Sequence, residues 1–397
     1  MQRKLVCMLP TFATTEYVKD TLMVPYYIAK RYDYSASIVY LQSSVSNNVA
    51  ESYKGVQLIS IPHDGKKLEG LRATWKLAVY LFHHYRDIDL LICFHFNYQT
   101  GCLGLLYKLL HRKGKFYIKC DGYGLWLSLF RGAFCFPGMK PRNHHHPIVK
   151  LKDYGIKYLL YGMTYLADRV SAETLKVCDY LKGHRPFIQH PNKLVQLLNG
   201  MDEEAIDHYG IADLPVEQKE NLIISVGRHG TWPKNTQMLL DALARVNLKD
   251  WQVYFIGPID PAFQSSVADF YQKQGDLKSS VHFIGPVYEQ QKLWAYYNRA
   301  KVFIHTSLSE SYGIVLCEAF RFNDYILSTD VGIAAELIRK QGGSAKQLLP
   351  HNDSKYLANR IQEIVDGDCN VALHYDNKSL SWSNEIEKLS SLLDNEN

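Results

Sequence analysis

Two carboxylates and two cations stand out in the second half of the chain. Glu310 and Glu318 flank a run of small and aliphatic residues in SESYGIVLCEAF, and Arg228 and Lys234 lie in the earlier stretch VGRHGTWPKN. Carboxylates accept hydrogen bonds from pairs of sugar hydroxyls, and neighbouring cations bind phosphate groups. The four residues therefore point to a ligand that joins a sugar to a diphosphate. A solvated loop with incidental charges at Arg228 and Lys234 is the alternative.

The residues between the two glutamates predict the start of a helix. TSLSESYG is typical of a loop that caps a helix, and IVLCEAF continues as the helix. Gly313 allows a ligand close to the backbone, and first-turn amides such as those of Ile314 and Val315 can bind phosphate. Glu310 precedes this helix and Glu318 lies more than one turn inside it, so each carboxylate can face one end of an extended ligand. A capped helix with a partly buried glutamate is the other interpretation.

Length and composition place the chain among soluble globular proteins. Its 397 residues suit two domains of roughly 150–200 residues each. With 47% hydrophobic and 21% charged residues the composition is ordinary, and a net charge of +5 argues against a nucleic-acid-binding protein. The eight cysteines form no CxxC pair, and no run reaches the roughly 18 apolar residues of a membrane span. We expect free thiols and a cytoplasmic protein that at most attaches to a membrane surface.

Apolar strand patterns alternate with amphipathic helical patterns along most of the sequence. Runs such as KLVCML, DLLICFHF, NLIISVG and KVFIH are apolar on both faces, as in parallel strands covered on each side. Helical patterns such as GLRATWKLAVYLFHHYRDI and NTQMLLDALARV lie between them. The alternation predicts an α/β protein with two doubly wound Rossmann-like domains facing a cleft. The expected boundaries are 1–201 for the first domain, 202–220 for a linker, 221–378 for the second domain, and 379–397 for a helix crossing back to the first.

In combination, the motifs of the second half resemble the retaining glycosyltransferases of family 4, which have the GT-B fold and an EX7E motif. Glu310 and Glu318 supply the EX7E spacing, and the resemblance extends over residues 195–350, including NGMD, VYFIGP and STDVGIAAELI. It implies that Glu310 contacts the donor sugar, that Glu318 holds the ribose hydroxyls, and that Arg228 and Lys234 hold the diphosphate. Backbone groups near Gly285 and Val287 would then border the nucleobase.

The resemblance also implies a mechanism. The anomeric configuration is retained, the diphosphate itself accepts the proton of the acceptor hydroxyl, and neither a metal nor another cofactor is needed. The cations would stabilise the charge that grows on the leaving diphosphate. Asp87-Ile88-Asp89 matches a metal-binding DxD pattern, but it opens a predicted strand at the end away from the cleft. We therefore expect no metal site.

The first half departs from the family at two positions. Relatives usually carry a glycine-rich loop after the first strand, whereas LPTFATTEYVKD contains no glycine. The hydroxyls of Thr11, Thr14 or Thr15 could replace it, and a capped helix start is the alternative. After KFYIKC, where many relatives have a histidine, stands DGYG. Asp121 is the residue we expect to contact the sugar or the acceptor; an Asx-turn that opens a helix is the alternative.

Residues 124–152 combine apolar anchors with cations. Trp126, Phe130 and Phe134 lie beside Arg131, Lys140 and further basic residues, as in a segment that binds a membrane interface. Core aromatics next to a solvated basic loop explain the pattern equally well. The membrane interpretation implies a lipid-linked glycan acceptor. Three consecutive histidines, 144–146, cannot easily converge on one metal ion.

The sequence thus predicts a metal-independent retaining glycosyltransferase that moves a hexose from a nucleotide sugar, expected to be UDP-linked, to a glycan. Synthesis of bacterial surface polysaccharide is the expected setting. The alternative is a non-catalytic GT-B subunit that binds a partner enzyme, which the glycine-free loop favours and the four charged residues oppose. A nicotinamide-dependent oxidoreductase is disfavoured because no GxGxxG follows a predicted strand.

Overall fold

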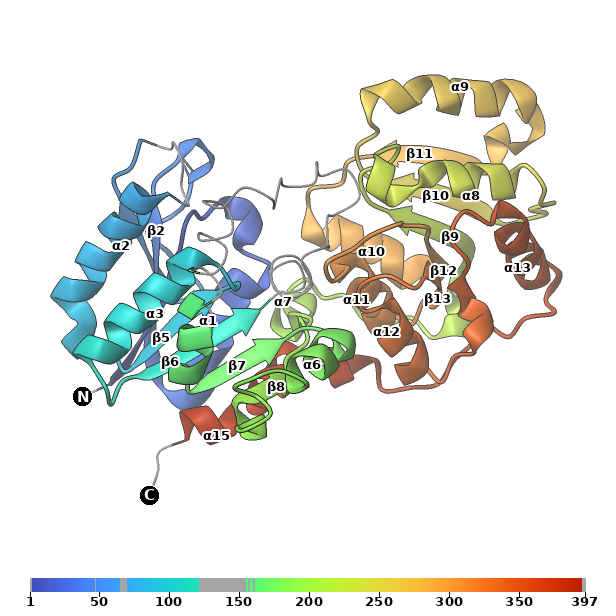
Figure 1. Ribbon diagram of the computed structural model, residues 1–397. Coiled ribbons are helices and arrows are strands. Elements are labelled where there is room, and N and C mark those ends of the chain that lie inside the picture. Colours follow the sequence, from blue (N-terminus) through green and yellow to red (C-terminus); the bar gives the residue numbers. More distant parts are fainter. Residues whose placement is uncertain are drawn as a thin grey trace. The chain divides into compact units, whose positions relative to one another are not determined.

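The computed structural model describes residues 2–46, 48–64, 70–120, 155, 158–159 and 161–394. The chain forms two compact units (Figure 1). Residues 1–200 and 382–397 make up the first unit, and residues 201–381 the second. Each unit contains a sheet of mainly or wholly parallel strands between helices, which confirms the predicted pair of Rossmann-like α/β domains.

The first unit is built on an eight-stranded sheet in the order β3-β4-β2-β1-β5-β6-β7-β8. All neighbouring strands are parallel except the short β3, which pairs antiparallel with β4. The strands are β1 (Arg3–Leu9), β2 (Tyr34–Leu41), β3 (Ser52–Tyr53), β4 (Val56–Ile61), β5 (Leu90–Phe94), β6 (Lys115–Cys120), β7 (Arg169–Ala172) and β8 (Leu194–Gln196).

Helices cover both faces of this sheet because alternate residues of its strands point to opposite sides. In β1, Val6 and Met8 face a core closed by α2 (Leu71–His84), α3 (Tyr98–Leu110) and α6 (Leu175–Lys182). Leu5 and Cys7 face the opposite core, which α1 (Asp20–Tyr32) closes.

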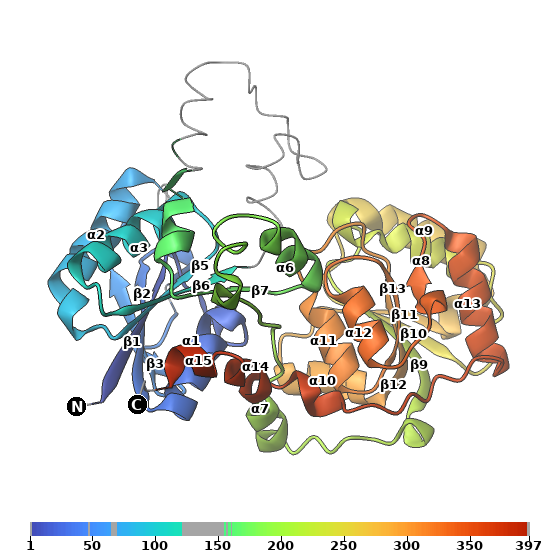
Figure 2. The ribbon, with the colours of Figure 1, turned by 60° about the horizontal axis from the view of Figure 1, so that its bottom comes forward.

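The C-terminal segment completes the first unit. Helices α14 (Trp382–Glu387) and α15 (Ser390–Leu393) lie beside α1 in Figure 2. Trp382, only 2% exposed, packs with Leu389 in the α1 core. This confirms the predicted return of the C-terminal helix to the first domain. The return buries the large indole of Trp382 in an apolar core.

The second unit has a six-stranded parallel sheet in the order β11-β10-β9-β12-β13-β14. Its strands are β9 (Glu220–Val226), β10 (Gln252–Ile256), β11 (Val281–Gly285), β12 (Ala300–His305), β13 (Tyr325–Thr329) and β14 (Leu348–Leu349). Its helices are α7 (Glu203–His208), α8 (Thr236–Leu243), α9 (Gln264–Lys273), α10 (Gln290–Arg299), α11 (Ile314–Arg321), α12 (Ala334–Lys340) and α13 (Ser354–Asp366). Helices α8 and α13 close the core on one face of the sheet.

Residues 202–220, where the sequence suggested a linker, pack into the second unit. Helix α7 begins at an N-cap, Asp202, whose side chain accepts a hydrogen bond from the amide of Ala205. The buried guanidinium of Arg321 pairs with Glu203 at 2.6 Å and with Asp213 at 2.8 Å. These ion pairs hold the polar segment against α11, and composition alone does not show such long-range pairing.

Among the described helices, none combines the length and the hydrophobicity that a membrane span requires.

Candidate functional site

The loops at the carboxyl edge of the second sheet form a pocket of about 310 Å³. Because all six strands are parallel, the loops that follow β9, β10 and β11 meet at this one edge. The lining residues come from these loops and from α10: Val226, Gly227, Arg228, Lys234, Ile256, Gly257, Pro258, Pro286, Val287, Tyr288 and Leu293. Three residues singled out in the sequence, Arg228, Lys234 and Val287, therefore line one cavity.

Glu310 joins this group through Lys234. Its Oε1 accepts hydrogen bonds from Lys234 Nζ at 2.5 Å, from Ser307 Oγ at 2.7 Å and from His305 Nε2 at 3.1 Å. Its Oε2 has no hydrogen-bond partner among the described residues. One oxygen thus fixes the carboxylate, and the other remains able to accept a hydrogen bond from a ligand.

The environment keeps Glu310 ionised. Burial raises its pKa, but hydrogen bonding and charge from His305 and Lys234 outweigh burial and hold the pKa at about 2. Burial lowers the pKa of His305 despite the neighbouring carboxylate. The imidazole is therefore neutral at pH 7, and Lys234 is the cation that balances Glu310 there.

Hydrogen bonds to backbone carbonyl oxygens fix the loops after β9 and β12 relative to each other. Thr306 Oγ1 donates to the carbonyl oxygens of Lys234 and Asn235, both at 3.1 Å, and the amide of Leu308 donates to Pro233 at 2.7 Å. Gly257, with φ of 134°, permits a close approach beneath the pocket, because a Cβ there would lie 2.0 Å from the Gly227 oxygen. The lysine–glutamate geometry is thus preorganised by the fold.

Arg228 differs from Lys234 because its guanidinium is exposed and has no side-chain partner among the described residues. A buried neighbour, His229, anchors the loop between them: its Nε2 lies 3.2 Å from the Ile256 oxygen and its ring lies edge-on to Phe255. Burial lowers the pKa of His229 to about 4, so its ring is neutral at pH 7. Arg228 therefore projects from a fixed backbone as a cation available to a ligand.

The start of α11 lies next to Glu310. Gly313 precedes the helix with φ of 92°, and a Cβ there would lie 3.9 Å from Glu310 Cγ and 2.9 Å from Leu316 Cδ1. Ile314 is 41% exposed and Val315 is half-buried. No side chain caps this helix start. Ile314 and Val315 thus lie in the first turn of α11, directly after Gly313.

Glu318 lies apart from the pocket lining, between α10 and α11. It is 7% exposed, and its Oε1 accepts from Gln290 Nε2 at 3.0 Å and from Trp294 Nε1 at 3.1 Å. Burial raises its pKa, against the hydrogen bonds from Trp294 and Gln290. A ligand reaching Glu318 would therefore meet a carboxylate already held by α10.

The turn after β11 borders the pocket. Gly285 has φ of 83°, and its carbonyl oxygen accepts a hydrogen bond from the Gly257 amide at 2.8 Å. This turn directs the following residues, Pro286, Val287 and Tyr288, into the pocket lining. Tyr288 is 89% exposed. The rim is thus apolar and aromatic, in keeping with a planar ligand group.

The first unit has its own charged cluster at the carboxyl ends of its strands. The buried Lys119 Nζ, at the end of β6, contacts Asp20 at 2.8 Å, Glu173 at 2.7 Å and Asn199 at 2.8 Å. Burial lowers the pKa of Lys119, but the two carboxylates outweigh it and raise the pKa above its usual value. Asp121 follows two residues later and lies outside the described residues, as does the segment 124–152.

Four residues that contact the glutamates were not predicted from the sequence: His305, Ser307, Gln290 and Trp294. His305 and Ser307 directly precede the EX7E stretch, at the carboxyl end of β12. A polar pair at such a strand end was an available signal. Gln290 and Trp294 are one turn apart on α10, and only the packing of α10 against α11 brings them to Glu318.

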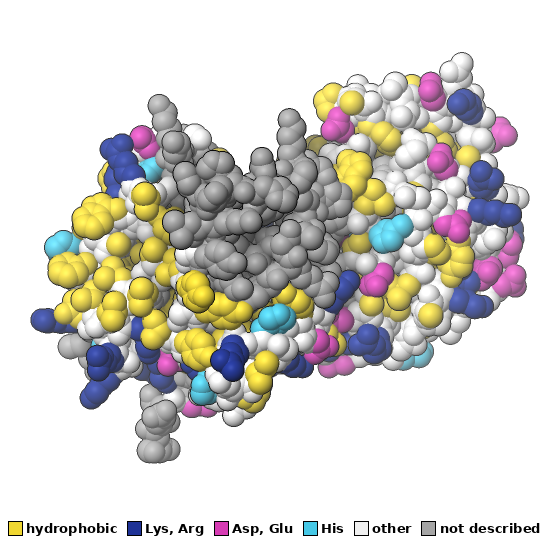
Figure 3. Space-filling view, viewed as in Figure 1, with side chains coloured by type: hydrophobic (Ala, Val, Ile, Leu, Met, Phe, Trp, Pro, Cys, Tyr) yellow, Lys and Arg dark blue, Asp and Glu magenta, His cyan; other side chains and the backbone are white. Residues whose placement is uncertain are grey.

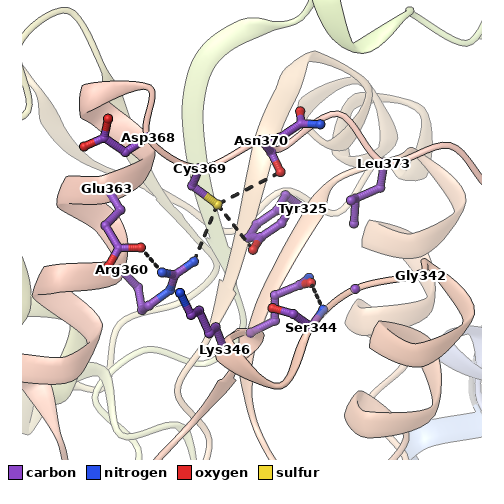
Figure 4. Close-up of a pocket in the computed structure, with 12 residues that line it drawn as sticks. Tyr325, Gly342, Ser344, Lys346, Arg360, Glu363, Asp368, Cys369, Asn370 and Leu373 are labelled. Carbon is purple, nitrogen blue, oxygen red and sulfur yellow. Dashed lines mark hydrogen bonds and ion pairs between the residues drawn. The ribbon is translucent and has the colours of Figure 1, made fainter.

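A second pocket, of about 290 Å³, lies beside β13 and the C-terminal end of α13 (Figure 4). Cys369 Sγ lies 3.5 Å from Arg360 Nη2 and 3.4 Å from the Tyr325 hydroxyl, and Arg360 also pairs with Glu363. None of the residues singled out in the sequence lines this pocket. Arg360 in this pocket is thus engaged with Cys369 and Glu363, whereas Arg228 in the first pocket has no side-chain partner among the described residues.

The known proteins that this chain resembles include glycosyltransferases. Residues 211–382 match the family described as glycosyl transferases group 1. No curated protein is significantly similar to the chain in sequence. Similar solved structures include sucrose-phosphate synthase from Thermosynechococcus elongatus, with 17% identity, a TM-score of 0.61, and coverage of 99% of this chain and 95% of that one.

Two further structures extend the comparison. HepE from Anabaena in complex with UDP-glucose is 16% identical with a TM-score of 0.58, covering 98% of this chain and 99% of that one. A glycosyltransferase from Rickettsia africae is 14% identical with a TM-score of 0.61, covering 99% and 98%. Such low identities establish the fold alone. The chain therefore has the GT-B glycosyltransferase fold, and its residues 211–382 match the group 1 glycosyltransferases.

Proposed function

We propose that the protein is a retaining glycosyltransferase that moves a hexose from a UDP-sugar to a glycan. One observation carries the proposal: Glu310 is held ionised through one oxygen, beside Lys234 and the pocket that contains Arg228. A structural ion pair has no need of an adjacent exposed cation or of a helix start without a side-chain cap. The group 1 match and the structural similarity to HepE, which was solved with UDP-glucose, support the same choice of donor.

In this proposal the four charged residues divide the donor between them. Glu310 Oε2 accepts from hydroxyls of the sugar, Arg228 and Lys234 bind the diphosphate, and Glu318 receives the ribose hydroxyls. Val287 and the turn at Gly285 border the base. Arg228 and Lys234 stabilise the diphosphate more strongly as the bond between the anomeric carbon and the diphosphate oxygen breaks, because negative charge then accumulates on the diphosphate.

Retention follows if the acceptor oxygen attacks from the face that the diphosphate leaves. The acceptor hydroxyl forms the new bond to the anomeric carbon, and its proton passes to the departing diphosphate oxygen. Glu310 then needs to act only as a carboxylate, in agreement with its low pKa. This scheme uses no metal, so activity should persist in EDTA. Proton NMR of the first-formed product reports its anomeric configuration.

The acceptor is proposed to be a lipid-linked glycan on the cytoplasmic face of a bacterial membrane, in surface polysaccharide synthesis. One solved structure with this fold is a lipopolysaccharide outer core galactosyltransferase, 13% identical over 98% of the chain with a TM-score of 0.60. Membrane contact through residues 124–152 belongs to this proposal and rests on their sequence. Asp121 is proposed to contact the sugar or the acceptor.

A non-catalytic subunit is the second candidate, and the loop after β1 favours it. This loop has no glycine, and Thr11 is engaged with Ser43, their hydroxyl oxygens lying 3.0 Å apart. A subunit of this kind would keep the fold but would bind no donor.

Calorimetry distinguishes the two candidates. UDP, GDP, ADP and their common sugars are titrated into the wild type and into Glu318→Ala. We expect one nucleotide to bind selectively and the variant to bind it at least tenfold more weakly, because the ribose loses its carboxylate partner. Gln237→Ala, an exposed change on α8, is the matched control and should bind normally. Absence of binding by every nucleotide would overturn the donor site and leave the subunit.

A further inference from the structure

Helix α2 of the first unit is apolar on two opposite faces. At about 100° per residue, its buried residues Ala73, Leu77 and Leu81 fall within one arc that faces the core. Its large exposed residues occupy another arc, roughly 80° wide, on the far side: Leu71 (80% exposed), Trp75 (69%), Val79 (37%) and Phe82 (55%). An ordinary surface helix exposes polar residues on that face.

Helix α3 packs against α2 and extends this surface. Leu105 and Leu109, one turn apart, are 38% and 67% exposed. Figure 3 shows hydrophobic side chains gathered over α2 and α3, with Lys and Arg side chains at the margins. We call these six residues, Leu71, Trp75, Val79, Phe82, Leu105 and Leu109, the α2–α3 surface. A contiguous exposed apolar area of this kind marks an interaction site.

The charge on helices α2 and α3 is positive, and the acidic residues beside them are Asp64 at Arg72, Asp168 at Lys108, and Asp87, which follows Arg86 in the chain. Residues 71–86 and 98–115 contain no Asp or Glu. Basic residues in these stretches are Arg72, Lys76, Arg86, Lys108, Arg112, Lys113 and Lys115. Arg72, Arg86, Arg112 and Lys113 are exposed, and Arg72 is 3.7 Å from its only acidic contact among the described residues, Asp64. A partner that binds the α2–α3 surface must therefore present apolar groups to its hydrophobic side chains and negative charge to the surrounding cations.

We propose that the α2–α3 surface docks on an anionic lipid bilayer. Trp75, Phe82 and the leucines would enter the boundary between headgroups and acyl chains, while the surrounding cations contact anionic headgroups. A second copy of the chain fits less well, since a symmetric contact would bring the same cations together. This surface is distinct from the segment 124–152, and docking requires neither donor nor acceptor.

Vesicle sedimentation with the full chain tests the proposal without any activity measurement. We expect binding to phosphatidylcholine vesicles containing about a third phosphatidylglycerol, weakening as salt rises, and much weaker binding to pure phosphatidylcholine. Trp75→Ser with Phe82→Ser should weaken the binding about tenfold or more. Val45→Ser with Ile188→Ser is the matched control, because these residues are 59% and 60% exposed elsewhere in the same unit. The control should bind as the wild type does.

The cations are tested separately. Arg112→Gln with Lys113→Gln should weaken binding to the anionic vesicles about tenfold or more and flatten its salt dependence. Lys249→Gln with Lys292→Gln, exposed positions of the second unit, should not. Brominated lipid should quench tryptophan fluorescence in the wild type and quench it less in Trp75→Phe.

Three results would overturn the proposal. Equal vesicle binding by the Trp75/Phe82 variant and its control would place the docking surface elsewhere, with 124–152 next in order. A wild-type dimer that becomes monomeric in that variant, measured by light scattering, would make a second copy the occupant. Absence of vesicle binding by a monomeric wild type would leave a protein partner. All substituted side chains are exposed, so unchanged thermal unfolding is the folding check.

Discussion

The second unit carries two lysine–carboxylate pairs at opposite edges of the same sheet. Lys219 and Asp324 stand at the amino ends of β9 and β13, 2.7 Å apart and completely buried. Lys234 and Glu310 stand at the carboxyl edge, 2.5 Å apart, with side chains 18% and 15% exposed. Both are ion pairs between a lysine ammonium and a carboxylate, but they differ in burial and in their hydrogen-bond partners.

Lys219 is surrounded by acceptors. Besides Asp324, its ammonium lies within hydrogen-bond distance of the carbonyl oxygens of Tyr297 in α10, Ala300 at the start of β12 and Phe322 before β13. Asp324 has one donor on Oδ1, and its buried Oδ2 has no partner among the described residues. Burial therefore prevails over Lys219 and raises the pKa of Asp324 to about 8.

The opposite balance holds at the carboxyl edge. Glu310 has three donors on one oxygen, and its pKa falls to about 2 even though burial acts against ionisation. Lys219, whose ammonium is surrounded by acceptors, and the weakly ionised Asp324 hold the amino ends of two strands together. A permanently ionised acid with one free oxygen, beside an exposed Arg228, is suited to a ligand. Under the proposed function, the amino edge therefore serves stability and the carboxyl edge binds the donor.

Removing the amino-edge cation should have the largest effect. Lys219→Met removes, in a fully buried site, the ammonium that donates to Asp324 and to the carbonyl oxygens of Ala300 and Phe322. Because each buried acceptor left without a donor costs about 1–3 kcal/mol, we expect a loss of about 3–5 kcal/mol in the free energy of unfolding. Urea unfolding of the purified protein measures it. Lys249→Met, which breaks the exposed pair with Asp366, is the control and should cost no more than about 1 kcal/mol. A small loss in Lys219→Met would remove the contrast between the two edges.

Arg228, the exposed cation at the carboxyl edge, should show the reverse pattern: a small effect on stability and a large effect on turnover. Arg228→Ala removes an exposed side chain, so the free energy of unfolding should change by less than about 0.5 kcal/mol. Under the proposed function, turnover should fall about 100- to 1,000-fold while donor affinity falls only a few-fold, because the guanidinium acts on charge that grows as the bond breaks. Steady-state kinetics and calorimetry with the donor separate the two effects. Equal losses of affinity, with unchanged turnover of bound donor, would contradict this role.

The sequence predicted the carboxyl edge far better than the amino edge. Buried strands such as β5 and β9 are apolar runs that can be identified locally, and parallel pairing then places the residues after them at one edge. Arg228, Lys234 and Glu310 follow such strands, and a family resemblance added their roles. The short β3 was missed because two residues carry no periodic signal.

Residues that act through distant partners were not predictable in this way. Lys219 and Asp324 are 105 positions apart, and each resembles an ordinary surface charge in the sequence. Lys119 and Glu173 are 54 apart. Their pairing depends on strand order, which a single sequence specifies only once the whole sheet is assembled.

A pH titration sharpens the comparison through His229, which anchors the Arg228 loop. Its pKa is about 4 in the folded protein and near 6.5 when unfolded, because burial disfavours the charged ring. Between these values the unfolded chain binds more protons, so stability should decrease by about 3 kcal/mol as the pH falls from 6.5 to 4. Urea unfolding across this range measures the slope.

Variants identify the group responsible. His229→Gln should flatten the slope, whereas replacement of the exposed His351 by Gln should leave it unchanged. An equal slope in His229→Gln and the wild type would assign the acid sensitivity to another residue.

The smallest expected effect concerns Glu318, whose environment lies between the two pairs: buried like Asp324, yet held by more than one donor like Glu310. Trp294→Phe removes the indole donor at 3.1 Å and leaves Gln290, so the pKa of Glu318 should rise further and the protein should lose about 1 kcal/mol of stability. If Glu318 binds ribose as a carboxylate, nucleotide affinity should begin to fall at a higher pH than in the wild type, because protonation removes an acceptor. Calorimetry between pH 5 and 8 detects the shift. Trp251→Phe, a buried indole in the core beside α8, controls for the loss of ring size. Matching pH profiles in Trp294→Phe and Trp251→Phe would show that α10 supports Glu318 by packing alone.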